Sequence, residues 1–242
     1  MAVNLTSRII MEINYSQFEE RAGQLKSRIR AACDVCGRNP DEIDVVAVTK
    51  SHPFEAVEYA VRYGFRRIGE NRVQEADQKW KEIDPRVGLE LIGHLQTNKA
   101  RLAVSLFNRI QSVDRIKLVK VLNRHCEEVG KSLSILLQVN SGEDPRKFGV
   151  SREEAPKLME ETQAVPHLAI EGLMTIAPLS LEKDVARLAF DRLRELRDRL
   201  AERSGLPLKV LSMGMTNDME EAIQSGSTCI RVGTALFGVR RG

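Results

Sequence analysis

Val45-Val46-Ala47-Val48-Thr49-Lys50 is an apolar run that ends in a lysine, and Ser51-His52-Pro53 leads from it into a helical pattern. The run is typical of a buried strand. The turn after it lacks the Gly-x-Gly-x-x-Gly signature with which dinucleotide-binding, doubly wound sheets enter their first helix. The stretch therefore favours a closed barrel over an open sheet of that kind.

Strand and helix patterns alternate from this stretch to the end of the chain. Eight such units in 242 residues match a TIM (β/α)8 barrel in number and length. No linker rich in Pro, Gly or Ser divides the chain, so a single domain over residues 1–242 is expected. The predicted strands are 43–49, 65–69, 88–92, 108–113, 133–140, 168–174, 208–212 and 228–232, and the predicted helices are 53–63, 71–82, 115–129, 151–163, 182–203 and 216–225.

An extra helix is predicted before the first strand, from about Ser16 to Cys36. Met11 is a plausible true start, so residues 1–10 are interpreted as an upstream extension and residues 1–12 as an extension or a disordered segment. Cys33 and Cys36 form a lone Cys-x-x-Cys pair in this helix. Because a second ligand pair is missing, we predict neither a metal nor a redox site there.

Composition and charge argue against several classes of function. The formal net charge is only +3, and Lys and Arg alternate with Asp and Glu instead of forming a basic stripe, so no nucleic-acid partner is expected. No apolar stretch is long enough for a bilayer, and the N-terminus lacks the apolar centre of a signal peptide. We predict a cytoplasmic protein without a membrane partner. A closed barrel exposes no sheet edge, so a monomer is expected.

Residues suited to ligand contact follow the predicted strands, at the end where TIM barrels carry their chemistry. For Asn71, Asp114 and Ser141 a role in a turn or a helix cap is an equally good interpretation. The joint pattern nevertheless indicates a site. The residues concerned are Lys50, Glu70, Asn71, His94, Asp114, Asn140, Ser141, Met174, Thr175, Ser212, Met213, Gly214, Arg231, Gly233 and Thr234.

Lys50 is the candidate for covalent chemistry. A lysine at the end of a buried strand has a desolvated stem, which favours the neutral amine that forms an imine with an aldehyde or ketone. On this segment alone, a lysine that merely reaches solvent is an equally good interpretation.

Two loops suit an anion. Residues 212–218 follow the seventh predicted strand, and Gly233-Thr234-Ala235 follows the eighth. Small residues let backbone N–H groups approach an anion, hydroxyls add donors, and a helix start adds a favourable dipole. TIM barrels frequently bind phosphate at this place. The alternative is that the glycines only form tight turns.

A barrel brings its eighth strand beside its first, so the lysine and the two anion-binding loops become neighbours. A phosphorylated aldehyde would bridge them, and pyridoxal 5'-phosphate (PLP) fits that description.

The chain resembles the pyridoxal phosphate homeostasis protein family. The resemblance rests on residues 46–50, 69–75, 92–99, 138–140, 171–176, 211–218 and 230–238, which occur in the expected order. It implies a barrel like that of alanine racemase, with PLP bound as a Schiff base to Lys50 and Arg231 facing the pyridine nitrogen. It further implies phosphate contacts from Ser212, Gly233 and Thr234, and positions near the cofactor for Asn71, His94 and Met174.

Arg231 bears on the choice between carrier and enzyme. A guanidinium only donates hydrogen bonds, so it should keep the pyridine nitrogen unprotonated, which argues against a strongly stabilised carbanion. The leading hypothesis is therefore a protein of vitamin B6 (PLP) homeostasis that holds PLP with little or no catalysis and exchanges it with apo-enzymes or free amino acids.

Two enzymatic alternatives stay open. An amino-acid racemase of low activity would need a second base on the opposite face of the cofactor. Tyr15, Tyr59 and Tyr63 are expected away from the site, which leaves His94. The favoured interpretation of His94 is nevertheless a neutral histidine that fills a polar position at the end of a strand. A barrel aldolase would instead use Lys50 against a phosphorylated sugar.

Overall fold

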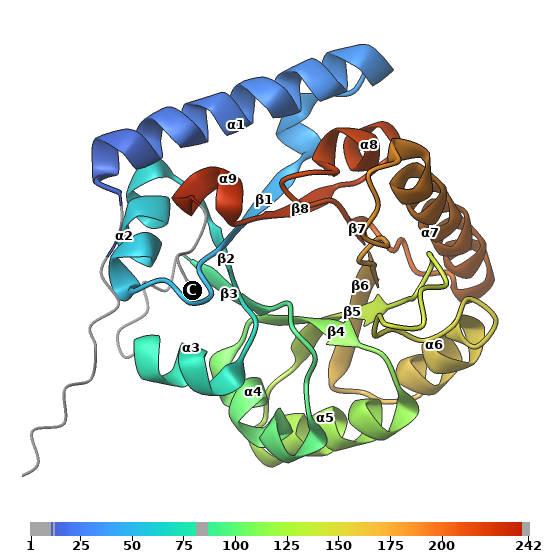
Figure 1. Cartoon of the computed structure of the whole chain (residues 1–242). Coiled ribbons are helices and arrows are strands. Elements are labelled where there is room, and N and C mark those ends of the chain that lie inside the picture. Colours follow the sequence, from blue (N-terminus) through green and yellow to red (C-terminus); the bar gives the residue numbers. More distant parts are fainter. Residues whose placement is uncertain (1–10, 12, 81–86, 239–242) are drawn as a thin grey trace, which may run out of the picture.

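Eight parallel strands close into one barrel in the computed structural model, which describes residues 11, 13–80 and 87–238 (Figure 1). β1 pairs with β2 on one side and with β8 on the other, where Val46 lies opposite Arg231. The predicted TIM barrel is confirmed. The strands are β1 (Asp44–Val48), β2 (Arg67–Glu70), β3 (Gly88–Leu91), β4 (Arg109–Val113), β5 (Leu133–Gln138), β6 (Leu168–Met174), β7 (Val210–Ser212) and β8 (Cys229–Val232).

Helices surround the barrel and cover its outer face (Figure 1). They are α1 (Tyr15–Cys36), α2 (Phe54–Tyr63), α3 (Val73–Lys79), α4 (Ala100–Leu106), α5 (Ile116–Glu128), α6 (Ala155–Gln163), α7 (Lys183–Ser204), α8 (Met219–Gln224) and α9 (Thr234–Phe237), with two 3-10 turns at Pro40–Glu42 and Thr97–Lys99. The larger apolar core lies between the strands and these helices, and it includes Phe18, Leu122 and Phe190.

Three of the predicted helices begin two to four residues later than expected. α6 begins at Ala155 because residues 151–154 form a turn in which the Glu154 N–H donates to Ser151 Oγ. α8 begins at Met219 because the Met215 N–H donates to Asp218 Oδ1 and closes a turn ahead of it. α3 covers only part of the predicted helix 71–82, whose last two residues lie outside the described chain.

The extra N-terminal helix is present as α1. Asn14 and Gln17 form a reciprocal capping box at its start, and Gly37 ends it with a φ of 68°. α1 lies outside the ring of strands, across α2, α8 and α9 (Figure 1). Except for Met11, the predicted extension 1–12 lies outside the described residues.

The interior of the barrel is unusually polar near its amino-terminal end. The Glu90 carboxylate accepts hydrogen bonds from Arg67 at 3.0 Å, Arg109 at 2.7 Å and Gln111 at 2.5 Å. Burial alone would lower the pKa of Arg109, but the neighbouring Glu90 carboxylate outweighs it and raises that pKa. The buried charges are thus paired, as charges in a protein interior must be.

Two further observations concern sites predicted to be absent. Cys33 and Cys36 are free thiols, and the Cys36 sulfur donates to the Ala32 carbonyl. Within residues 11, 13–80 and 87–238, no cluster of His, Cys, Asp and Glu has a metal-binding arrangement. No helix in the same residues combines the length and the apolar character that crossing a bilayer requires.

Candidate functional site

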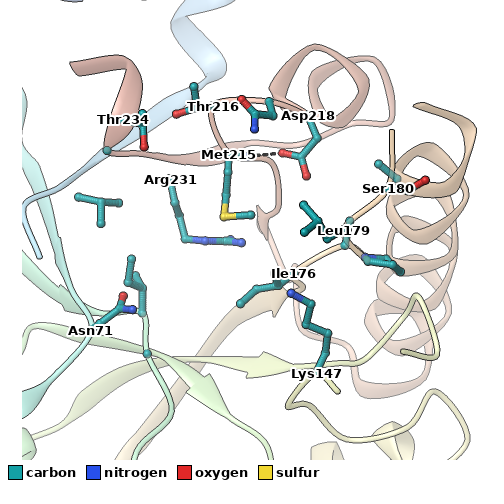
Figure 2. A pocket seen from close by; sticks show the side chains of 18 of the residues that line it. Asn71, Lys147, Ile176, Leu179, Ser180, Met215, Thr216, Asp218, Arg231 and Thr234 are labelled. Carbon is teal, nitrogen blue, oxygen red and sulfur yellow. Dashed lines mark hydrogen bonds between the residues drawn. The ribbon is translucent and has the colours of Figure 1, made fainter. Parts of the chain in front are cut away.

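A cavity of about 740 Å³ opens at the carboxyl ends of the strands. Six of the eight predicted site residues line it together. They are Lys50, Asn71, His94, Arg231, Gly233 and Thr234. Figure 2 shows Arg231 reaching across the cavity, with Thr216 and Thr234 on one side of it and Asn71 on the other. The structure thus brings residues from β1, β2, β3 and β8 to one site.

Lys50 lies two residues after the end of β1 and lines the cavity together with Val48, the last residue of that strand. Because both residues line it, the Val48 and Lys50 side chains face the same cavity. The turn that follows is tight. Ser51 has a φ of 59°, and its N–H donates to the Glu75 carboxylate. This turn ends the strand and directs the half-buried Lys50 side chain towards the ligand space.

A buried ion pair, Glu70 and Lys79, contacts the residue that follows β1. The Glu70 carboxylate accepts from Thr49 Oγ1 and from Lys79 Nζ, each at 2.7 Å. Lys79 also donates to the Thr49 carbonyl at 2.8 Å. Burial raises the pKa of Glu70, whereas its partner Lys79 acts against that shift. The backbone that carries Lys50 is therefore fixed to β2 and α3.

The two loops predicted to bind an anion contribute Thr216, Gly233 and Thr234 to the cavity wall. Thr216 Oγ1 accepts from the Ala235 N–H at 3.3 Å, which joins the loops after β7 and β8. A Cβ atom on Gly233 would lie 3.2 Å from the Val48 carbonyl oxygen, so this position suits a residue without a side chain. Both loops predicted from the sequence therefore reach the same wall of the cavity.

Backbone donors in these loops are free for an anion. Within the described residues, the N–H groups of Thr216, Asn217 and Thr234 have no protein acceptor. The helices after the loops, α8 and α9, have only six and four residues. Their dipoles are correspondingly small, so an anion placed here would depend mainly on the hydroxyls and individual N–H groups.

Arg231 is almost fully buried, at 4% exposed, and both of its recorded partners are neutral oxygen atoms. It donates to Ser212 Oγ at 2.6 Å and to the Thr175 carbonyl at 2.7 Å. Burial lowers the pKa of Arg231, yet a guanidinium stays protonated at neutral pH. No carboxylate among the described residues forms an ion pair with it. The cavity therefore contains a buried cation that has neutral hydrogen-bond acceptors but no carboxylate partner among the described residues.

Ser212 and Met174, the other two predicted site residues, are not among the residues that line the cavity. The Ser212 hydroxyl donates to Gln111 Oε1 at 2.6 Å while it accepts from Arg231. Met174 is fully buried at the end of β6. Both residues are fully buried, Met174 as the last residue of β6 and Ser212 as the last residue of β7. The hydroxyl that reaches the cavity is that of Thr216, later in the same loop.

His94 lines the cavity and has a carboxylate partner. Its Nδ1 lies 3.4 Å from Asp114 Oδ2, and its ring stacks on Phe148 with centroids 4.1 Å apart. An imidazole held in this way can accept or donate a proton at its other nitrogen. The three tyrosines do not line the cavity: Tyr15, Tyr59 and Tyr63 pack around Phe18 between α1 and α2.

Sequence reasoning missed the outer part of the cavity. Lys147 and Phe148 come from the loop after β5, and residues 176–181 come from the segment after β6. Figure 2 shows the Lys147 amine pointing into the cavity beside Ile176. These residues lie several positions beyond their strands, where strand-end patterns give no signal. The basic pair Arg146-Lys147 was the one available hint.

Comparison with known proteins agrees with this geometry. The family model for the alanine racemase N-terminal domain matches residues 21–241. An alanine racemase of Clostridium difficile has a TM-score of 0.75 at 13% identity, and the match covers 95% of this chain and 58% of that one. At that identity the likeness shows a shared barrel fold. The protein is thus a barrel of the alanine racemase N-terminal class.

Closer relatives define the family. The pyridoxal phosphate homeostasis protein of Pseudomonas aeruginosa is 38% identical over 226 residues, which cover 93% of this chain and 96% of that protein. The Escherichia coli K12 protein of the same name is 36% identical, covering 90% and 94%. PipY of Synechococcus elongatus, in a structure with PLP bound, has a TM-score of 0.82 at 37% identity, covering 91% and 100%. The chain belongs to the pyridoxal phosphate homeostasis protein family.

Proposed function

We propose that this protein binds PLP through a reversible Schiff base with Lys50 and acts in PLP homeostasis without substantial catalysis. The observation that carries the proposal is the convergence of Lys50, the loops after β7 and β8, and Arg231 on one cavity. The PLP bound in PipY supports it. We further propose that the whole chain is one domain, a monomer, and cytoplasmic.

The cavity residues fit the separate parts of PLP. When bound, the cofactor supplies an aldehyde for an amine and an aromatic ring that accepts electrons. Lys50 provides the amine. Thr216, Gly233 and Thr234 offer hydroxyl and backbone donors for the phosphate. Arg231 seeks an acceptor and has only neutral oxygen partners, so an unprotonated pyridine nitrogen suits it.

Four predicted residues complete the proposed site in different ways. Asn71 and His94 line the cavity and are proposed to contact the ligand directly. Ser212 is proposed to act through Arg231, whose guanidinium it holds. Met174 is proposed to pack beneath the site, because it is buried and absent from the cavity wall.

The outer part of the cavity supports exchange with amines. A cavity of about 740 Å³ is at the upper end of the usual range for small-molecule sites, so a second small molecule has room beside the first. A Schiff base passes between amines without an oxidant or a reductant. We propose free amino acids and the active-site lysines of apo-enzymes as the recipients.

The Lys50 assignment is tested by absorbance, intact mass and borohydride reduction. Wild-type protein incubated with PLP should absorb as a Schiff base, and reduction should fix one PLP on the peptide that contains Lys50. The Lys50→Ala variant should lose both signals. Lys117→Ala, which changes an exposed lysine on α5, is the matched control. A Schiff base that persists in Lys50→Ala, or reduction onto another lysine, would overturn the assignment.

A racemase of low activity is the second candidate, and the His94–Asp114 pair favours it. This candidate requires His94 to exchange the α-proton of an amino acid with solvent. Deuterium incorporation into alanine in D₂O should then occur above the level of PLP alone, and His94→Gln should remove it. Incorporation that is equal in both proteins would exclude His94 as the base.

A further inference from the structure

α1 is the one helix described before the first strand, so it lies outside the repeating strand–helix units. It packs across α8 and α9, the two helices that begin after the anion-binding loops (Figure 1). One polar side chain of α1 reaches the first of these loops. Arg28 donates from its Nη2 atom to the Thr216 carbonyl at 2.9 Å and from Nε to Glu220 Oε1 at 2.8 Å.

This contact fixes the orientation of the peptide group between Thr216 and Asn217. In a trans peptide the C=O and N–H bonds point in opposite directions. Because Arg28 holds the Thr216 carbonyl towards α1, the Asn217 N–H points away from α1. Thr216 and Asn217 both line the cavity, and that N–H has no protein acceptor among the described residues.

Three contacts together determine the shape of this loop. Asp218 Oδ1 accepts from the Met215 N–H at 2.6 Å, and Thr216 Oγ1 accepts from the Ala235 N–H at 3.3 Å. Both of these contacts lie within the two anion-binding loops. Arg28 supplies the contact from outside the barrel units, and Glu220 on α8 holds its guanidinium in place.

We propose that Arg28 is a positioning residue for the phosphate group of the ligand. The proposal rests on the proposed function. Arg28 does not line the cavity, so it acts through the Thr216–Asn217 peptide and not by touching the ligand. It therefore contributes to the preference for a phosphorylated ligand over the same aldehyde without phosphate.

A second contact of α1 serves the site without bearing on phosphate. Phe18 stacks on Phe237 of α9 with centroids 5.3 Å apart, and Phe237 packs against His52 at 5.1 Å, two residues after Lys50. Phe18 and Phe237 are buried, and His52 is half-buried and lines the cavity, so these contacts support the ligand site as a whole. The separation predicts that Arg28 and Phe18 affect ligand binding in distinguishable ways.

The test compares PLP with pyridoxal, which has the same ring and aldehyde but no phosphate. Arg28→Ala should weaken PLP binding by about five- to tenfold, in line with the net loss of one ordinary hydrogen bond, and weaken pyridoxal binding less than about twofold. Arg28→Lys should be intermediate, because an ammonium lacks the planar fork that bridges two acceptors. Arg30→Ala, an exposed arginine on the same helix, should match wild type for both ligands.

Absorbance titration gives the affinities, and thermal unfolding checks that each variant is folded. Arg28 is 41% exposed, so its truncation is compatible with folding. If Arg28→Ala does not fold, Glu220→Gln, which weakens the hold on Arg28, should show a smaller loss in the same direction. Equal losses for PLP and pyridoxal, or unchanged PLP binding, would overturn the proposal. A wild-type protein without PLP on Lys50 would instead overturn the proposed function.

Discussion

Arg231 donates to Ser212 Oγ at 2.6 Å, and the Ser212 hydroxyl in turn donates to Gln111 Oε1 at 2.6 Å. Gln111 in turn donates to the Glu90 carboxylate. Each donor and acceptor in this series is fixed, because a guanidinium only donates and a carboxylate only accepts. A carboxylate deep in the barrel thus reaches the cavity cation only through two neutral groups. Because no carboxylate contacts it directly among the described residues, the positive charge of Arg231 is available to interact with a ligand.

Ser212→Ala should weaken ligand binding without changing phosphate preference. The change leaves one buried Arg231 N–H and the Gln111 carbonyl without a partner, which should lower the free energy of unfolding by about 1–3 kcal/mol. Affinity for PLP and for pyridoxal should fall by the same several-fold factor, because Ser212 orients Arg231 and not the phosphate. Chemical denaturation and absorbance titration measure both effects. A loss of affinity confined to PLP would instead indicate that Ser212 contacts the phosphate.

The fold was predictable because its determinants are local and repeated. Alternating apolar runs and amphipathic segments locate each strand to within two residues at either end. The site was predictable where a residue lies at or just after the end of a strand, as Arg231 within β8 and Lys50 after β1 show. How deeply a residue lies in the barrel could not be predicted, because the sequence does not show where a strand ends relative to its neighbours. The resemblance implied a phosphate contact for Ser212, and in the structure Thr216, later in the same loop, is the residue that lines the cavity.

The contacts between distant segments could not be predicted. Arg28 and Thr216 are 188 residues apart, and no pattern in either segment pairs them. The same holds for Lys147, whose loop turns back over the barrel after β5. Such contacts depend on how helices and loops pack once the barrel has closed.

Thr216→Val should reduce PLP affinity more than pyridoxal affinity. Valine keeps the shape of threonine but removes the hydroxyl that faces the cavity and accepts from the Ala235 N–H. The expected loss is about tenfold for PLP, because a buried donor and an anion each lose a partner. Thr216→Ser retains the hydroxyl and is the matched control. A Thr216→Val protein with wild-type PLP affinity would place the phosphate elsewhere.

Glu171→Gln should change the acid stability of the protein. Burial alone would raise the pKa of Glu171, but hydrogen bonds from Ser134 and Arg109 outweigh it and lower the pKa below the ordinary 4.5. A carboxyl group with a lowered native pKa adds stability above its unfolded pKa and loses it as the pH falls through the native pKa. The side chain is 38% exposed, so the contribution is modest, about 1 kcal/mol or less.

At pH 7 the Glu171→Gln variant should therefore unfold more readily than wild type, and the difference should shrink as the pH falls below 4.5. Urea denaturation at a series of pH values measures it. Glu195→Gln on α7 changes an exposed carboxyl group and is the control. A difference that grows with acidity would contradict the assigned direction.

Gly233→Ala tests how closely the ligand must approach the backbone. The backbone φ at Gly233 is −118°, which alanine adopts without strain, so any effect comes from the added methyl group. That methyl would lie 3.2 Å from the Val48 carbonyl and 3.4 Å from Val48 Cβ, so β1 and the loop after β8 must separate by a few tenths of an ångström.

Because Lys50 follows Val48, the separation alters the span between the amine and the anion-binding loops. PLP, which is proposed to bridge both, should lose affinity by about tenfold or more, since correct placement depends on sub-ångström geometry. Pyridoxal, held at one end, should lose much less affinity.

Gly130→Ala, at an open turn after α5, controls for the loss of a glycine. Its own φ of 64° adds backbone strain but no change at the cavity. Titration of the two proteins with both ligands decides the matter, and equal PLP affinity for Gly233→Ala and wild type would mean that no ligand bridges Lys50 and the Gly233 loop.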